Sequence, residues 1–124
     1  MNEMFRICAL DELSDPGSLE FQWGEGDWPL EMFVIRQGNS AFGYLNRCPH
    51  AGHALNWQSD RFLTNKRDLI LCQSHGARFT IDEGLCVLGP CPGERLRPIK
   101  LLLHDGDVLV DVRDLERLKA ETEI

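Results

Sequence analysis

The chain has 124 residues, of which 43% are hydrophobic and 27% charged, and a formal net charge of −7. We expect residues 1–124 to form one small domain, because this length buries one core but not two. The acidic balance argues against a nucleic-acid partner, whose binders usually present a basic face. No apolar run approaches the roughly 18 residues that cross a membrane, and the N-terminus lacks the basic and apolar regions of a secretory signal. We therefore expect a cytoplasmic location and no membrane span.

Short apolar or alternating runs, separated by Gly, Pro, Asn and Asp, follow one another along most of the chain, which is typical of an all-β protein. The predicted strands are Phe5–Leu10, Met32–Arg36, Ala41–Leu45, Leu69–Leu71, Ala77–Ile81, Leu85–Leu88, Leu96–Leu103 and Val108–Val112. The polar turns at 37–40 and 104–107 predict two hairpins.

The remaining segments predict loops and one helix. Asp11–Pro29 is rich in Gly, Pro and acidic residues and predicts an irregular connection, with at most a short strand near Phe21–Trp23. Trp57–Asp68 is polar and predicts a second long loop. Only Asp114–Glu123 has helical periodicity.

Five cysteines in a reducing compartment favour metal binding over disulfides. Four candidate ligands form two mixed motifs, Cys48-Pro49-His50 and Cys72-Gln73-Ser74-His75. Each motif follows a strand-like run that ends at its cysteine, so we expect two neighbouring turns that close on one centre. Two thiolates and two imidazoles suit either one zinc ion or a 2Fe-2S cluster. The best-known Cys2His2 zinc sites place both histidines on a helix, and neither histidine here lies near a predicted helix, which favours the cluster.

The segments Cys48-Pro49-His50-Ala51-Gly52-His53 and Cys72-Gln73-Ser74-His75-Gly76 resemble the two cluster-binding boxes of Rieske iron–sulfur proteins. Gly89-Pro90-Cys91-Pro92-Gly93 resembles the proline-containing loop that covers the cluster in that family. The resemblance implies a Rieske-like antiparallel β sandwich or barrel, with two cluster-binding loops at one end, a short C-terminal helix and one 2Fe-2S cluster per chain.

The resemblance also implies a ligand set. It assigns Cys48 and Cys72 to one iron, and His50 and His75 to the other. The residues that it places around the cluster are His53, Gly76, Ala77, Gly89 and Pro90. The 21 residues between the boxes (51–71) are several more than is usual in the family.

Four substitutions relative to the respiratory Rieske proteins indicate a low-potential centre. Those proteins carry one additional Cys in each box, bridged to each other, where this chain has His53 and Ser74. They also place a Ser and a Tyr after the second box to donate hydroxyl hydrogen bonds, where this chain has Ala77 and Phe79. Such donors stabilise the reduced, more negative state, so their absence lowers the potential. The closest resemblance is to the stand-alone, bridge-free ferredoxins that feed oxygenases.

By this resemblance the protein is an electron carrier, not an enzyme, and it passes electrons from a reductase to an oxygenase or similar enzyme. A Rieske oxygenase itself needs a second, mononuclear iron with two His and a carboxylate, and no His follows His104. The alternatives are a non-catalytic Rieske subunit, a redox sensor in a larger complex, or a structural zinc module. Cys86 and Cys91 are expected as a packed strand thiol and a loop residue near the cluster, with a disulfide as the alternative. Trp23, Trp28 and Trp57 are expected to pack in the interior.

Overall fold

Three antiparallel sheets make up the computed structural model, which describes residues 3–49 and 52–122. The first sheet has the order β1 (Met4–Ala9), β10 (Asp107–Asp111), β9 (Leu101–His104). The second has the order β2 (Gly17–Trp23), β3 (Leu30–Gln37), β4 (Ser40–Leu45), β8 (Pro98–Ile99). The third has the order β5 (Ile70–Leu71), β6 (Arg78–Phe79), β7 (Cys86–Leu88). One short 3-10 helix, η1 (Leu10–Glu12), and one α-helix, α1 (Val112–Thr122), complete the elements, and the all-β class is confirmed.

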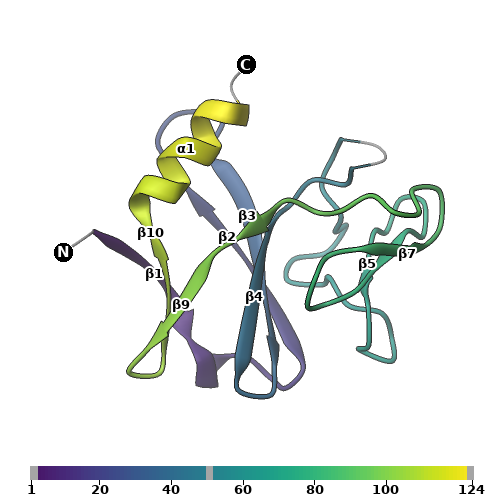
Figure 1. Cartoon of the computed structure of the whole chain (residues 1–124), viewed down its shortest axis with the longest axis horizontal. Coiled ribbons are helices and arrows are strands. Elements are labelled where there is room, and N and C mark those ends of the chain that lie inside the picture. Colours follow the sequence, from purple (N-terminus) through teal and green to yellow (C-terminus); the bar gives the residue numbers. More distant parts are fainter. Residues whose placement is uncertain (1–2, 50–51, 123–124) are drawn as a thin grey trace.

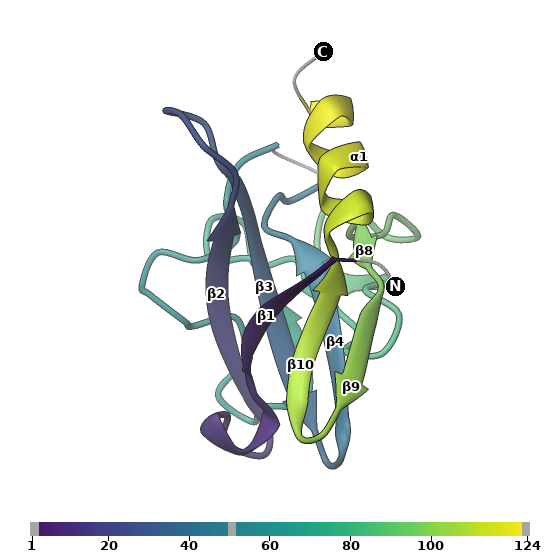
Figure 2. The ribbon, with the colours of Figure 1, turned by 90° about the vertical axis from the view of Figure 1, so that its left-hand side faces the viewer.

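The third sheet and its loops lie apart from the first two sheets, to the right in Figure 1. We call residues 46–96 the site half, and residues 3–45 and 97–122 the base half. The first two sheets wrap around each other in the base half, and α1 continues from β10 at one end of it (Figure 2). Leu115 and Leu118 of α1 are buried against the base half, and the helix begins two residues before Asp114, where it was predicted to begin.

Strand β3 connects the two halves because both of its faces are buried. Met32 and Val34 point into the core of the base half, whereas Phe33 and Ile35 belong to the core of the site half. Successive residues of a strand point to opposite faces, so a strand buried on both sides is apolar throughout. This explains the uninterrupted apolar run in the middle of β3.

The predicted strand Ala77–Ile81 is shortened to β6, Arg78–Phe79, and two larger differences affect the sheets. Residues 17–23 form a full seven-residue strand, where we expected an irregular connection, because β2 pairs with β3 along its whole length, from Gly17 with Arg36 to Trp23 with Leu30. The predicted strand Leu96–Leu103 is divided at Lys100: β8 pairs with β4, and β9 pairs with β10. The chain changes sheets at this point. The predicted hairpins at 37–40 and 104–107 are confirmed.

The long segment between the two boxes covers the free edge of β2. The backbone amide of Glu20 donates to Oδ1 of Asp60 at 2.8 Å, and the Ser18 hydroxyl donates to the Asp60 carbonyl at 2.6 Å. The same segment inserts Phe62 into the site half, where its ring stacks on Phe33 with centroids 4.2 Å apart. Unpaired edge strands invite aggregation unless they are covered. The additional length of this loop therefore protects an edge and supplies a core residue.

Within the described residues, no helix is long and apolar enough to cross a membrane.

Candidate metal centre

The two predicted ligand turns have the same backbone hydrogen bonds. In the first, the amide of Cys48 donates to the carbonyl of His53 at 2.8 Å, and the amide of Gly52 donates to the carbonyl of Cys48 at 2.7 Å. In the second, the amide of Cys72 donates to the carbonyl of Ala77 at 2.9 Å, and the amide of Gly76 donates to the carbonyl of Cys72 at 3.0 Å. Each cysteine therefore begins a closed turn that ends five residues later. We call residues 46–55 loop 1 and residues 72–77 loop 2.

The glycine in each turn is required by backbone conformation, not by lack of space. Gly52 and Gly76 both have φ +73°, and nothing lies within 4 Å of a Cβ built on either residue. Residues other than glycine rarely adopt this region of φ. Gly52 and Gly76 thus close two equivalent turns.

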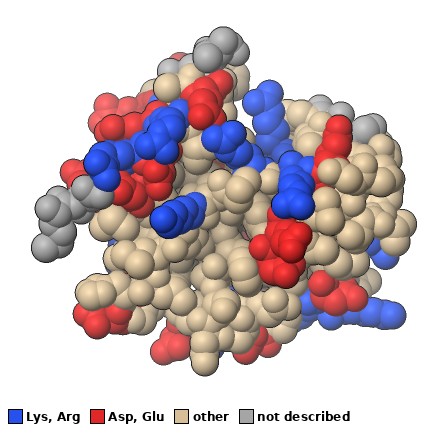
Figure 3. Space-filling model, viewed as in Figure 1, with Lys and Arg blue, Asp and Glu red and all other residues tan. Residues whose placement is uncertain are grey.

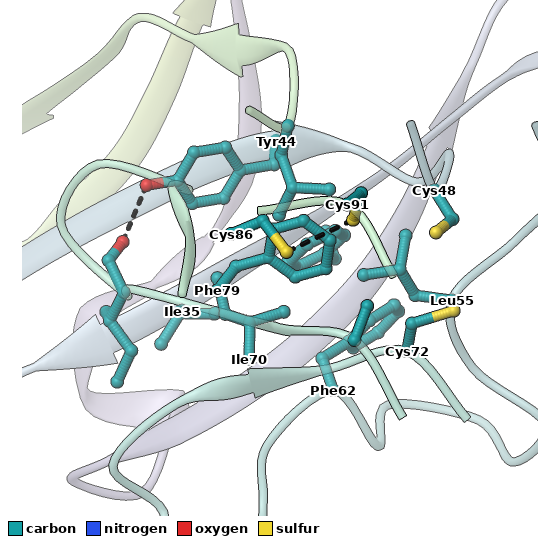
Figure 4. Close-up of a cluster of buried hydrophobic side chains, with 14 residues drawn as sticks. Ile35, Tyr44, Cys48, Leu55, Phe62, Ile70, Cys72, Phe79, Cys86 and Cys91 are labelled. Carbon is teal, nitrogen blue, oxygen red and sulfur yellow. Dashed lines mark hydrogen bonds between the residues drawn. The ribbon is translucent and has the colours of Figure 1, made fainter. Parts of the chain in front are cut away.

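The two cysteine side chains meet at one end of the core of the site half (Figure 4). Both are fully buried, and they lie near enough for the Cys48 thiol to affect the pKa of Cys72. Burial raises the pKa of Cys72, the backbone amides of Ser74 and His75 lower it, and the Cys48 thiol raises it. The two amide donors point at the sulfur, where they stabilise a thiolate, and two adjacent thiolates suit one shared iron.

Loops 1 and 2 are joined to each other and to the end of β4. The amide of Gln73 donates to the carbonyl of Leu55 at 2.8 Å, which links the loops directly. Asn46 is a buried polar residue whose side chain accepts from the amide of Leu55 at 2.9 Å and donates to Asn56 Oδ1 at 2.9 Å. A satisfied buried amide of this kind rigidifies its surroundings. Asn46 was not predicted as a site residue, because a single polar residue after a strand carries no distinctive signal.

A third segment, residues 89–93, lies directly on loop 2, and we call it loop 3. A Cβ on Gly89 would lie 2.7 Å from Cα of Ala77, and Gly89 has φ +101°. Ala77 is fully buried, whereas Pro90 is exposed. The two backbones can approach this closely only because residue 89 has no side chain. The structure thus places Gly89 directly against Ala77, next to Gly76 in the chain, and leaves Pro90 exposed.

His53 of loop 1 and His75 of loop 2 are both exposed. The ring centroid of His75 lies 6.1 Å from that of His53. Nδ1 of His53 is 3.1 Å from the carbonyl of Ala54. His50, the remaining predicted ligand, lies outside the described residues. Within 3–49 and 52–122, no three Cys, His, Asp or Glu side chains gather into a site for a single metal ion.

The Tyr44 hydroxyl bonds to a backbone carbonyl within the site half. The Tyr44 hydroxyl, buried in the core of the site half, donates to the carbonyl of Ile81 at 2.6 Å. Burial raises the pKa of Tyr44, and the charges of Asp82 and Glu83 raise it further. Residue 79 is a fully buried Phe, which has no hydroxyl to donate.

Cys86 lies on β7 and Cys91 lies in the loop that follows, as expected, and both are buried free thiols. Trp57 and Trp28 are 72% and 85% exposed, so the expectation that they pack in the interior was wrong. Trp57 instead extends over loop 2, where its Nε1 donates to the Ser74 hydroxyl at 3.4 Å. The long loop that carries Trp57 presents it at the surface beside the ligand turns.

Comparison with known proteins identifies the family. A family model described as the Rieske [2Fe-2S] domain matches residues 3–112. The chain belongs to the Rieske [2Fe-2S] domain family. Its cofactor is therefore a 2Fe-2S cluster, as the sequence predicted. The residues present fit this group, because two buried, adjacent thiols on hydrogen-bonded turns are the donors that an iron–sulfur cluster requires.

Individual relatives show where the similarity extends. The chain is 29% identical over 82 residues to the cytochrome b6-f complex iron-sulfur subunit of Chlorobaculum tepidum, covering 66% of this chain and 41% of that protein. The ferredoxin of carbazole 1,9a-dioxygenase from Nocardioides aromaticivorans superposes with a TM-score of 0.67 at 24% identity, covering 87% of this chain and 96% of the ferredoxin. The terminal oxygenase of carbazole 1,9a-dioxygenase from a Novosphingobium species superposes with a TM-score of 0.70 at 20% identity, covering 89% of this chain but 30% of the oxygenase. These structures share the fold, and the match extends over nearly the whole ferredoxin but only part of the oxygenase.

Proposed function

We propose that this protein is a Rieske-type ferredoxin, which accepts single electrons from a reductase and delivers them to an oxygenase or similar enzyme. The observation that carries the proposal is the pair of buried thiols on two equivalent, hydrogen-bonded turns in a chain of this family. The full-length similarity to ferredoxin structures supports a carrier over the oxygenase itself. When bound, the 2Fe-2S cluster supplies a reversible one-electron couple. The protein holds and shields that couple and has no catalytic step of its own.

The ligands that we propose are Cys48 and Cys72 on one iron, and His50 and His75 on the other. The burial and contact of the two thiols support the first pair, and the exposed position of His75 supports an iron that faces a partner. The chain contains four histidines, which makes a complete test feasible. His50→Ala and His75→Ala should each remove or shift the visible bands, whereas His53→Ala and His104→Ala should keep the cluster. Unchanged visible bands in either of the first two variants would refute the assignment.

We infer a low midpoint potential, because Ala77 and Phe79 offer no hydroxyl and the only tyrosine of the chain donates to Ile81. A redox titration of the cluster-loaded protein should give a midpoint below zero and a stoichiometry of one electron per chain. A midpoint well above zero would contradict the absence of donors to the cluster. The five free cysteines further support a reducing, cytoplasmic location.

The partner surface that we propose carries the exposed residues His53 of loop 1, His75 of loop 2 and Trp57, which follows loop 1. An exposed Trp beside a redox centre is a typical anchor of a transient interface. On the face shown in Figure 3, acidic and basic side chains are interspersed around a mostly uncharged centre, so the net charge of −7 is not concentrated in one patch there. Steering by the overall negative charge should still weaken as salt increases.

The docking surface is tested with a flavin-dependent ferredoxin reductase in stopped-flow reduction of the cluster. Trp57→Ala should slow second-order reduction several-fold while the visible bands and midpoint stay unchanged. Leu102→Ala is the matched control, because Leu102 is also an exposed apolar residue (52%) but lies on β9 in the base half. Equal effects of the two substitutions, or rates that do not change from low to high salt, would argue against this surface.

A further inference from the structure

Two thiols that the proposed cluster does not use lie next to each other in the core of the site half. Sγ of Cys91 is 3.1 Å from Sγ of Cys86, and both residues are buried. Figure 4 shows them in the same cluster of side chains as Cys48 and Cys72. A disulfide bond has an S–S length of about 2.05 Å, so the two sulfur atoms need to approach by only about 1 Å to form one.

The backbone holds this pair in place. The amide of Cys86 donates to the carbonyl of Glu94 at 2.8 Å, and the amide of Gly93 donates to the carbonyl of Cys86 at 3.1 Å. The chain therefore leaves Cys86, passes through loop 3 and returns to lie beside it. Pro90 and Pro92 flank Cys91 and restrict its backbone further. The short distance between the sulfur atoms is thus a consequence of the fold, and it does not depend on a side-chain rotamer alone.

Removing the two thiol protons leaves no buried group without a partner. The Cys91 thiol donates to Cys86 Sγ, and the Cys86 thiol donates to the carbonyl of Leu88 at 3.4 Å. The only acceptor that loses a donor is the Leu88 carbonyl. Leu88 is 55% exposed, so water can replace the thiol there.

We propose that Cys86 and Cys91 are a redox-active dithiol that forms a reversible disulfide when the protein meets a hydroperoxide. One thiol sulfur attacks the peroxide, its proton leaves, and a sulfenic acid and one water form. The second thiol sulfur then displaces the hydroxyl of the sulfenic acid as a second water, so that two thiols and one hydrogen peroxide give one disulfide and two waters. The two sulfur atoms are oxidised by two electrons in total, and the peroxide is reduced by two.

The location of the pair gives the bond a structural consequence. Cys91 belongs to loop 3, which contacts loop 2 through Gly89 and Ala77, and Cys86 belongs to β7. The disulfide therefore ties the loop that lies over the ligand turns to the third sheet. Respiratory Rieske proteins carry a bridge between the two boxes, whereas this bridge would lie behind the site. Because both thiols are buried, we expect them to react slowly and only at elevated peroxide concentrations.

The arrangement of tryptic sites makes the test specific. Trypsin cleaves after Arg78 and Arg95, which places Cys86 and Cys91 together on the peptide 79–95, and each of the other three cysteines lies on a different peptide. The cluster-loaded protein is treated with hydrogen peroxide, excess peroxide is removed with catalase, and the protein is denatured in N-ethylmaleimide before digestion. After treatment, the peptide 79–95 should lack both maleimide groups and be two hydrogen atoms lighter than the dithiol peptide. Dithiothreitol should restore two alkylation sites.

Two variants complete the experiment. Cys91→Ala should leave one alkylatable thiol on this peptide, and Cys8→Ala, which removes a buried thiol from the base half, should leave disulfide formation unchanged. Two alkylated cysteines at every peroxide concentration, a sulfinic acid on one of them, or a disulfide to a different peptide would each overturn the proposal. The readout is the thiol state of one peptide. A failure of the electron-transfer proposal would not change it.

Discussion

The base half and the site half are stabilised in different ways. Apart from the two-residue β8, the strands of the base half have four to eight residues and form long ladders, for example seven paired positions between β2 and β3. Among the described residues of the site half, the strands are β5, β6 and β7, which are two or three residues long. Its order depends on an apolar core, on hydrogen bonds between loops, and on the metal centre that we propose between them. Long ladders maintain a fold without a cofactor, whereas short strands around a metal site need one. The two halves share β3, whose two faces belong to different cores. A substitution on one face of β3 can therefore perturb one half more than the other.

Loss of a cluster ligand should produce the largest difference in hydrogen-exchange protection between the two halves. Cys72→Ala should abolish the visible bands, because a cluster cannot be held by the remaining thiolate, and it should leave the site half poorly ordered. Hydrogen exchange should then become fast across residues 46–96, while the amides of β3 and β10 stay protected. Cys8→Ala is the control and should keep both the bands and the protection. If the bands survive in Cys72→Ala, the ligand assignment is wrong.

Truncation of one large core residue in each half should separate stability from cluster retention. Phe62→Ala removes the ring stacked on Phe33 and should cost about 3–5 kcal/mol, and Met32→Ala on the opposite side of β3 should cost about 2–5 kcal/mol. Only Phe62→Ala should also accelerate bleaching of the visible bands in chelator. Urea unfolding and the bleaching rate measure the two effects. Equal bleaching rates would show that the two cores act as one.

The contact between loops 2 and 3 can be tested with two glycines. Gly89→Ala and Gly93→Ala each place a side chain at positive φ, which costs roughly 1–3 kcal/mol. Gly89→Ala should cost more than Gly93→Ala, because its Cβ also meets Cα of Ala77 at 2.7 Å, whereas nothing lies within 4 Å at Gly93. Thermal unfolding and the bleaching rate are the measurements. If the two variants behave alike, the close approach of the loops contributes nothing.

The smallest effect that we expect concerns the only tyrosine in the chain. Tyr44→Phe leaves the Ile81 carbonyl without its donor and should cost about 1–3 kcal/mol. Because burial raises the pKa of Tyr44 above that of an unfolded tyrosine, the folded state binds its proton more tightly. This contribution is fully present below about pH 10 and is lost as the pH rises further.

The pH dependence is measured by comparing urea unfolding of the wild type and Tyr44→Phe at pH 8 and pH 11. The wild type should lose more stability than the variant over this interval. Tyrosinate absorbance reports Tyr44 alone, because the sequence contains one Tyr, and its titration midpoint should lie above the ordinary value. A midpoint at the ordinary value, or parallel losses of stability, would show that Tyr44 is not buried as described.

Local patterns predicted the hairpins and the ligand turns, but not the paths of two strands. Residues 19, 21 and 23 are apolar and alternate with polar residues, yet the surrounding Gly, Pro and acidic residues obscured this signal for β2. The apolar run Leu96–Leu103 predicted one strand, because a sequence does not show that its two ends pair with different sheets. Phe62 was missed because it lies in a mostly polar segment, and Asn46 was missed because it is one polar residue at the end of an apolar strand.

The sequence by itself determined the cofactor, because Cys48, His50, Cys72 and His75 occur in two short motifs whose residue types and spacing belong to one family. It also determined the two closed turns, since each has a glycine four residues after its cysteine. Tertiary structure alone decided which side chains surround those turns. Residues far apart in the chain determine what covers the two faces of β3, how exposed Trp57 is and how closely Gly89 approaches Ala77. The return of loop 3 brings Cys91 close to Cys86. Such contacts form only when separate elements pack together, and no local pattern encodes them.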